Sequence, residues 1–254
     1  MKKKFTLLLL ILSVFVFLHI PLAEAAKYDQ VLQRWTKTKL YKGEDQLTNL
    51  TIYATYYSAE FIEAMIEKES NDNLWTKQET DDFKYKFLQS LRLDEMIPVH
   101  IKFINNADTM YLGPFDIMVG LRIGNKYYKP ADYDKRFNFK FQGEKEGLIY
   151  FHRYDEKTGK DLLKDVKQVT LELKPTISPT ITRGQTTKFL WDIAKDTPEA
   201  LYVGTTAARI ETDRLIKRLE KLRKDKADEE AKLASINGEI STIQARLDEL
   251  AKVQ

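Results

Sequence analysis

Few residues of this chain have the type and spacing that catalysis or metal binding requires. Outside the N-terminal segment the histidines are His100 and His152, and neither belongs to an H-E-x-x-H motif or lies near a cysteine pair. The serines lie outside G-x-S-x-G and S-x-x-K contexts, and no glycine-rich phosphate loop occurs. We therefore assign no catalytic, metal-binding or cofactor-binding residue, and we expect a protein that is not an enzyme.

Acidic residues gather at Asp132, at Asp134 and between Asp155 and Asp161. The last stretch has acidic residues at both ends, as a calcium loop has, but Lys157 takes a ligand position and no suitably spaced bidentate glutamate follows. We expect a hairpin turn there. Carboxylate pairs that hydrolyse sugars are assembled only in the fold, so an envelope hydrolase with a carboxylate site is kept as an alternative.

Three tyrosines form a candidate aromatic contact surface. Tyr127, Tyr128 and Tyr133 lie on either side of Pro130 in an expected loop. Exposed tyrosine rings stack on sugars or anchor protein partners. This cluster keeps open a carbohydrate-binding or ligand-binding module, while ordinary packing in strands and core is the simpler interpretation.

The clearest pattern in the chain is a spacing of apolar residues that is typical of helices that pair with one another. From Thr212 to Leu250 an apolar side chain returns every three or four residues, which in heptad notation forms a seam of a and d positions. The d positions are Leu215, Leu222, Ile236, Ile243 and Leu250, and the a positions are Leu219, Leu233, Ile240 and Leu247. The seam predicts a coiled-coil helix over residues 206–254, whose partner is a second copy or another helical protein.

Two charged residues interrupt this seam and bear on how copies would pair. Lys226 takes an a position and Glu229 the next d position. In a parallel homodimer each would face its own copy, whereas in an antiparallel one centred between Ala227 and Asp228 they meet each other, twice by symmetry. The flanking pairs of the parallel dimer include the like-charged Arg218–Arg223 and Asp225–Glu230. Those of the antiparallel dimer are attractive: Asp225–Lys232, Arg223–Glu230, Arg218–Glu239 and Glu211–Arg246. We favour the antiparallel homodimer, with other self-assembly, a different partner or docking on the same chain as alternatives.

The same stretch also allows a helical hairpin. Asn237-Gly238 is a turn-forming pair, but it falls at the exposed e and f positions and the heptad register continues past it. A turn would have no need to keep that register. We predict one continuous helix, in which an exposed glycine costs about 1 kcal/mol relative to alanine.

The N-terminus has the pattern of an export signal. Three lysines at positions 2–4 precede an apolar run, and Ala23-Glu24-Ala25 supplies the small-x-small cleavage pattern. We predict a signal peptide over residues 1–25 and a periplasmic or extracellular protein, with an uncleaved inner-membrane anchor as the alternative. No later segment is long and apolar enough to span a membrane, and the chain has no cysteine, so stability has to come from burial and assembly.

The charge balance points to no charged polymer as partner. The chain has 41 basic and 38 acidic residues. Three lysines and one glutamate fall within the predicted signal, so the remainder carries a net charge of about +1. We expect no nucleic-acid partner.

Residues 26–195 have the pattern of one β-rich globular domain. Alternation of apolar and polar residues predicts strands with one buried face. The apolar faces are Leu50–Tyr56, Ile97–Phe103, Ile117–Ile123, Phe137–Phe141 and Val169–Leu173, with a further strand over Leu148–Tyr154. Phe189–Ile193 fits a closing strand, with a short helix as the alternative. Turns are expected at Asn105–Asp108, Gly124-Asn125, Gly143-Glu144 and Lys157–Gly159. The predicted fold class is α+β, mainly an antiparallel β-sandwich, immunoglobulin-like or an open barrel, with a small helical insert and a terminal coiled-coil helix.

The helical insert is expected over about residues 58–80. Ser58 can cap its first helix, and Thr76 with Glu79 matches a capping box for a second. Residues 83–91 fit either a strand or one helical face, and alternation at Phe83, Tyr85 and Phe87 slightly favours a strand. Thr197-Pro198 and Gly204 mark residues 196–205 as a linker, with a short helix that begins at Pro198 and makes a stiff joint as the alternative. Together, the export signal, the lack of a catalytic motif and the heptad seam predict an exported structural or protein-interaction module that assembles through its C-terminal helix.

Overall fold

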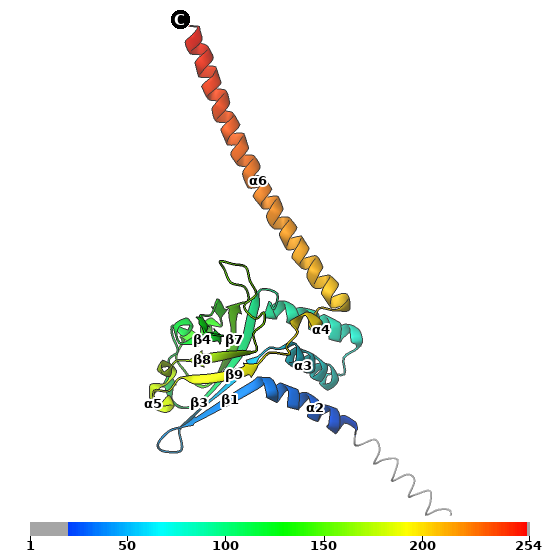
Figure 1. Cartoon of the computed structure of the whole chain (residues 1–254), viewed down its shortest axis with the longest axis vertical. Helices are drawn as coiled ribbons and strands as arrows, with labels where there is room; N and C mark the ends of the chain where they lie inside the picture. Colours follow the sequence, from blue (N-terminus) through cyan, green and yellow to red (C-terminus); the bar gives the residue numbers. More distant parts are fainter. Residues whose placement is uncertain (1–19, 253–254) are drawn as a thin grey trace, which may run out of the picture. The chain divides into compact units, whose positions relative to one another are not determined.

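The computed structural model describes residues 20–252 and is of the mixed α+β class. It divides into two compact units, with the boundary between Tyr202 and Val203. The first unit contains two antiparallel sheets and the second is one long helix, α6 (Figure 1). Most of the predicted signal segment lies outside the described residues. Within residues 20–252, no helix combines the length and the apolar character that crossing a bilayer requires.

The larger sheet has five antiparallel strands in the order β1-β2-β3-β7-β6. The strands are β1 (Thr36–Lys42), β2 (Asn49–Tyr56), β3 (Met96–Met110), β6 (Asp132–Tyr133) and β7 (Phe141–His152). The predicted alternation in β3 is confirmed, because Ile97, Val99, Ile101 and Phe103 are each at most 2 % exposed. β3 is central, and its two neighbours satisfy its backbone groups on both sides.

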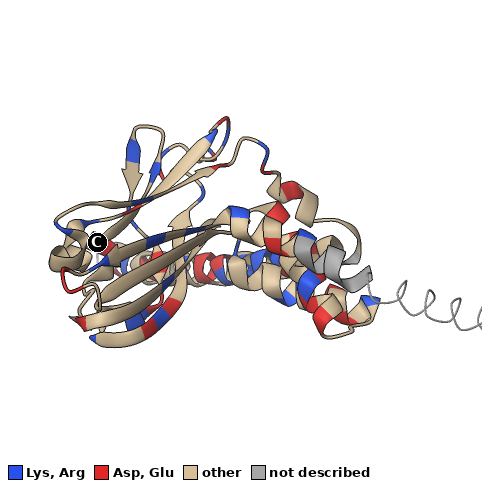
Figure 2. Ribbon diagram, turned by 90° about the horizontal axis from the view of Figure 1, so that it is seen from below, with Lys and Arg blue, Asp and Glu red and all other residues tan. Residues whose placement is uncertain are grey.

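The smaller sheet has four antiparallel strands in the order β5-β4-β8-β9. These are β4 (Val119–Ile123), β5 (Lys126–Tyr128), β8 (Gln168–Leu173) and β9 (Thr187–Asp192). The predicted turn at Gly124-Asn125 joins β4 to β5, and Gly124 has φ +57°, a left-handed conformation that glycine favours because it has no Cβ. Lysines, arginines and acidic residues are interspersed over the elements of the first unit (Figure 2).

Aromatic contacts join the two sheets. The ring of Trp191 on β9 lies 5.9 Å from that of Tyr56 on β2, and Tyr56 lies 5.8 Å from Trp35. Trp191 Nε1 donates a hydrogen bond of 2.8 Å to the Trp35 carbonyl. The hydroxyls of Tyr41 and Thr187 lie 2.7 Å apart and connect β1 with β9. Residues far apart in the sequence thus share one buried core.

Three helices accompany the sheets before β3, namely α2 (Ile20–Trp35), α3 (Ala59–Asp72) and α4 (Lys77–Leu91). The predicted caps are confirmed. Ser58 Oγ accepts a 3.0 Å bond from the Phe61 amide, and Thr76 forms a capping box with Glu79. Shorter helical turns are η1 (Phe115–Ile117), η2 (Lys135–Asn138), η3 (Pro175–Ile177), α5 (Pro179–Thr182) and η4 (Pro198–Leu201).

The slight preference for a strand at residues 83–87 is wrong, because these residues belong to α4, which extends the helical region to Leu91. Phe83 and Phe87 stack with centroids 5.8 Å apart, one helical turn from each other. Leu88 and Leu91 complete the packed face and are buried. The alternation of aromatic and lysine residues fits both a strand and one face of a helix, and the burial of Leu88 and Leu91 decides for the helix.

The expected strand over Phe137–Phe141 is also wrong. Lys135–Asn138 forms η2, which begins where Asp134 Oδ1 accepts a bond from the Arg136 amide, and β7 begins only at Phe141. Phe137 is fully buried with its ring 4.6 Å from Phe115. The strand expected from Ile117 begins two residues later, because η1 occupies Phe115–Ile117.

Two expected turns are instead irregularities within strands. β3 continues through Asn105–Asp108, with a register shift between Asn105 and Met110, and Gly143 lies opposite Asn105 inside β7 with φ +78°. Asn105 itself holds the bulge, since its amide nitrogen donates to the Asp108 carbonyl and its oxygen accepts from the Ala107 amide. The residues expected to form turns therefore lie in an irregular, bulged part of the β3–β7 pair.

The segment expected as a linker is partly structured. Pro198–Leu201 forms η4, and Leu201 is fully buried within the first unit. Asp196 Oδ1 accepts a 2.8 Å bond from the Ala59 amide at the start of α3. Residues 196–201 thus pack against the first unit and form its C-terminal end.

Candidate functional site

The candidate site is on α6 (Gly204–Ala251), a single helix of 48 residues. The prediction of one continuous helix through Asn237-Gly238 is confirmed. Gly204 starts the helix at φ +65°, after the extended Val203. At a rise of 1.5 Å per residue the helix is about 72 Å long.

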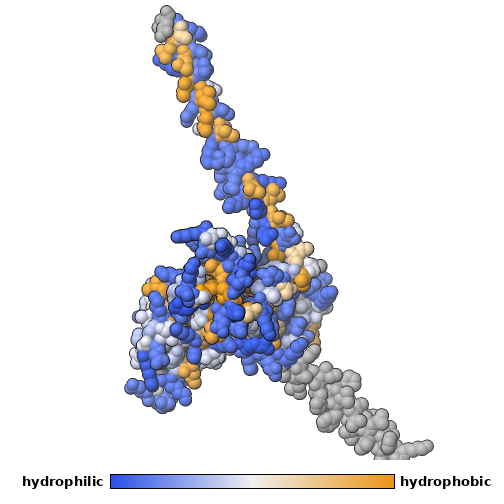
Figure 3. Space-filling view, in the orientation of Figure 1, coloured by the Kyte–Doolittle hydropathy of each residue, from blue (hydrophilic) through white to orange (hydrophobic). Residues whose placement is uncertain are grey.

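One face of α6 carries a row of apolar side chains that we call the α6 stripe. Its nine members are between 47 and 60 % exposed. They are Leu215, Leu219, Leu222, Leu233, Ile236, Ile240, Ile243, Leu247 and Leu250. Figure 3 shows apolar residues along the helix, with hydrophilic residues in the middle. Rows of exposed apolar side chains on both sides of this hydrophilic middle are typical of an interaction site.

The hydrophilic middle of the stripe contains Lys226 and Glu229. Within one chain each has a partner on the same helix: Lys226 Nζ lies 3.6 Å from Glu230, and Glu229 accepts a 2.7 Å bond from Lys232. All four side chains are largely exposed. Such surface pairs contribute about 0–1 kcal/mol, so they leave Lys226 and Glu229 available for stronger partners.

The three tyrosines of the candidate aromatic surface lie on two different sheets. Tyr127 and Tyr128 are on β5, and Tyr133 is on β6. Tyr127 is 37 % exposed and packs over Gly120, where an added Cβ would meet its ring. The Tyr133 ring lies 5.5 Å from buried Phe115, and Lys135 Nζ lies 3.8 Å above it. Contacts within the first unit therefore cover part of the Tyr127 and Tyr133 rings, which leaves less aromatic surface for a partner.

The histidines and the acidic loop have local partners. His100 Nε2 lies 3.7 Å from Glu146, and burial lowers the pKa of the imidazole. His152 Nε2 lies 3.6 Å from Glu156. Asp155 Oδ1 accepts bonds from the backbone amides of residues 157 and 158, chiefly the latter, and these bonds lower its pKa. The predicted turn at Lys157–Gly159 is thus confirmed and is built on a carboxylate that caps it.

The first unit also contains a partly buried polar cluster that no sequence pattern predicts. Arg153, whose side chain is 12 % exposed, donates to Asp161 at 2.9 Å, to the Leu93 carbonyl at 3.1 Å and to Glu199 at 3.2 Å. Burial raises the pKa of nearby Asp196, although hydrogen bonds from the Ala59 amide and the Tyr56 hydroxyl oppose this effect. A cavity of 320 Å³ adjoins the cluster. Its members come from distant segments, so no local spacing signals it.

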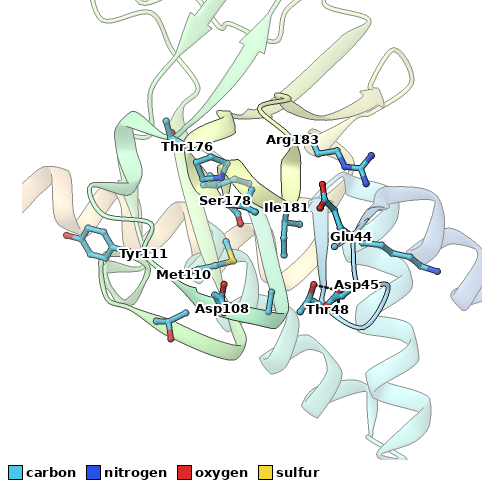
Figure 4. A pocket seen from close by; sticks show the side chains of 17 residues that line it. Glu44, Asp45, Thr48, Asp108, Met110, Tyr111, Thr176, Ser178, Ile181 and Arg183 are labelled. Atoms are coloured by element: carbon cyan, nitrogen blue, oxygen red, sulfur yellow. Dashed lines mark hydrogen bonds between the residues drawn. The ribbon is translucent and has the colours of Figure 1, made fainter.

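A cavity of 620 Å³ lies between the β1–β2 loop, the bulge of β3 and residues 176–183 (Figure 4). Asp45 on its rim holds the loop, since its Oδ1 accepts from the amides of Leu47 and Thr48 and from the Thr48 hydroxyl. Those bonds, that from the Thr48 amide first, lower the pKa of Asp45. The carboxylate is thereby committed to the turn rather than to a ligand.

The comparisons with known proteins identify no family. No family model matches the chain, and no curated protein matches it. A crystal structure of a novel protein of unknown function from Burkholderia pseudomallei K96243 is similar at a TM-score of 0.37 and 8 % sequence identity. The match covers 70 % of this chain and 88 % of that chain.

Proposed function

We propose that this protein is an exported, non-enzymatic structural or protein-interaction module that assembles through coiled-coil pairing of α6. The first unit, with its two sheets arranged as a β-sandwich-like body, supplies the structural or recognition surface. The single observation that carries the proposal is the α6 stripe, whose nine apolar side chains are 47–60 % exposed on a continuous helix.

The size of the stripe supports pairing along its whole length. Removing a half-exposed leucine or isoleucine from water contributes about 1 kcal/mol, so two stripes together contribute on the order of 15 kcal/mol. Association costs roughly 4–15 kcal/mol in lost freedom of motion and ordering. A partner that covers only a third of the stripe would contribute about 5 kcal/mol, close to the lower end of this cost, whereas a helix of similar length would reach its upper end.

The non-enzymatic part of the proposal is supported by the way in which the acidic side chains are used. Asp155 and Asp45 cap turns, Asp161 binds Arg153, and Glu172 binds Arg122 through two bonds of 2.8 Å. Each such carboxylate has a structural task within the first unit.

Export is supported by the lysines at positions 2–4 and by Ala23-Glu24-Ala25. The test is N-terminal sequencing of the protein recovered from the cell envelope or medium. A mature start at Ala26 or Lys27 is expected, and a retained residue 1 would refute cleavage.

The assembly role is tested with two doubly substituted full chains. Leu222→Glu/Leu233→Glu places charges within the stripe, and Ala227→Glu/Ala234→Glu adds the same charges at the adjacent b positions. Light scattering measures the molar mass, and cross-linking in the envelope identifies partners. We expect the first variant, but not the second, to lose its assembly or partners. If the stripe variant changes neither mass nor partners, the assembly role is wrong.

A further inference from the structure

We infer that the partner of the α6 stripe is the α6 stripe of a second copy of this chain, packed antiparallel and in full register. The inference rests on the proposed function, since it names the partner of the same surface. Four features of α6 support it: the bounds of the helix, the charges in the middle of the stripe, the charges beside it and the order of its apolar layers.

The bounds of the helix are symmetric about the centre that the charges select. α6 extends from Gly204 to Ala251, so its midpoint falls between Ala227 and Asp228. An antiparallel pair about that point places Gly204 of one copy beside Ala251 of the other, and neither helix extends past its partner. Each positive helix N-terminus then lies beside a negative C-terminus, which is favourable.

The charges in the middle of the stripe match only in the antiparallel arrangement. There, a positions face d positions, so Lys226 of each copy faces Glu229 of the other. In a parallel pair the two lysines would face each other, and so would the two glutamates. The weak pairs that these residues make within one helix, Lys226–Glu230 at 3.6 Å among them, compete little with a pair that is shielded between two helices.

The charges that flank the stripe select the same orientation. In the antiparallel register g positions lie beside g positions, and e positions lie beside e positions. The resulting charged pairs are all attractive: Asp225–Lys232, Arg223–Glu230, Arg218–Glu239 and Glu211–Arg246. A parallel register would bring together Arg218 with Arg223 and Asp225 with Glu230, which are like-charged. Charges at these positions set partner choice and orientation in coiled coils.

The apolar layers continue outward from this centre. On each side of the charged middle three layers of leucine and isoleucine follow, and smaller residues come last. The layers are Leu222–Leu233, Leu219–Ile236, Leu215–Ile240, Thr212–Ile243 and Ala208–Leu247. Every member of the stripe except Leu250 is thereby paired with an apolar residue or, in the case of Ile243, with Thr212.

Charge reversal in the full chain tests the inference. Lys226→Glu and Glu229→Lys each create two like-charged contacts in the antiparallel pair, whereas the double exchange restores both attractions. We expect each single variant to raise the dimer dissociation constant by about tenfold, and the double variant to return within about threefold of the unsubstituted chain. Sedimentation equilibrium over a dilution series measures these constants.

Matched controls carry the same charge changes outside the stripe. Lys224→Glu lies at an f position and Asp228→Lys at a c position, and both are expected to leave the constant within about threefold. In a parallel dimer each single substitution replaces one like-charged pair, lysine with lysine or glutamate with glutamate, by another like-charged pair of opposite sign. Equal dissociation constants for the two single variants, their controls and the unsubstituted chain would therefore overturn the inference.

Spin labels measure the orientation directly. The chain has no cysteine, so Asp248→Cys and, separately, Ala227→Cys each give one label per copy. At 1.5 Å per residue, antiparallel labels at position 248 lie about 60 Å apart along the axis, while those at 227 lie within roughly 20 Å of each other. Short distances at both positions would overturn the antiparallel pairing and leave assembly through α6 intact. A chain that is monomeric would overturn the self-pairing, and the envelope cross-links of the stripe variant would then decide the proposed function alone.

Discussion

Replacement of Trp191 by phenylalanine probes how the two sheets are held together. Trp191 is 1 % exposed, and its Nε1 donates to the carbonyl of Trp35 over 2.8 Å. Phenylalanine keeps a ring against Tyr56 and Phe189 but removes the donor. Since Trp35 is itself buried, its carbonyl would become an acceptor without a partner at the junction of α2 and β1.

The expected cost has two parts. A buried acceptor left without its hydrogen bond costs about 1–3 kcal/mol. The smaller ring leaves a void that costs about another 1 kcal/mol. The free energy of unfolding of the first unit should fall by about 2–4 kcal/mol. For a unit of this size each kcal/mol lowers Tm by roughly 2–4 °C, so the fall in Tm is roughly 4–16 °C.

Trp35→Phe is the matched control, because it removes the same donor from another buried tryptophan. Trp35 Nε1 donates to Glu60 at 2.9 Å, but the Glu60 side chain is 45 % exposed and also accepts bonds from Arg34. Water can replace the lost donor there, so we expect a cost of only about 1–2 kcal/mol. Urea unfolding monitored by circular dichroism measures both variants. Equal losses in the two variants, or a loss below about 1 kcal/mol for Trp191→Phe, would refute the reasoning.

Three further outcomes follow from the first unit. Burial raises the pKa of Asp196, so its contribution to stability is full below its ordinary pKa and is lost as the pH rises through the raised pKa. Asp196→Asn should therefore gain stability relative to the unsubstituted chain as the pH rises above about 4, the ordinary pKa of an aspartate, as measured by urea midpoints at each pH. Arg153→Met leaves Asp161 without its largely buried partner and should cost about 3–5 kcal/mol, measured by the same assay. Gly120→Ala places a Cβ into the Tyr127 ring and should cost about 1–2 kcal/mol; in a Tyr127→Ala background the cost should disappear, and additive effects would exclude this contact as the cause.

Sequence patterns were sufficient where one local rule determines the structure. The heptad seam and its persistence through Asn237-Gly238 established α6 as one helix. Ser58 and the capping box of Thr76 placed the starts of α3 and α4, because capping depends only on residues within one turn. The alternation in β3 identified its buried face, because a strand has a strict period of two.

The failures occur where one pattern satisfies two rules. Phe83 and Phe87 fit both a helical face and an alternating strand, and only the packing of Leu88 and Leu91 decides between them. Asn105 and Gly143 have turn propensity, yet they lie opposite each other in a bulged pair of long strands. A turn and a bulge use the same residue types, so composition alone does not distinguish them.

The polar cluster around Arg153 could not be predicted for a different reason. Its contacts join residues separated by 46 positions, as in Arg153–Glu199, and by 60, as in Arg153–Leu93. A salt bridge of this kind has no periodicity, and each member looks like an ordinary surface charge in the sequence. The fold brings the end of β7 together with the segment before β3 and with η4.

The charged middle of the stripe is costly for association and informative about its purpose. Leucines at positions 226 and 229 would bury more apolar surface, but an uninterrupted seam would accept either orientation and several registers. Lys226 and Glu229 lie on either side of the helix midpoint, where one arrangement satisfies both and a shift by a heptad satisfies neither. In that arrangement the starts of the two helices lie about 70 Å apart along the axis. Each first unit precedes such a start in the chain, so antiparallel pairing would link two first units through opposite ends of one coiled coil. This connectivity agrees with the proposed structural role, because the pairing surface is separate from the surface of the first unit.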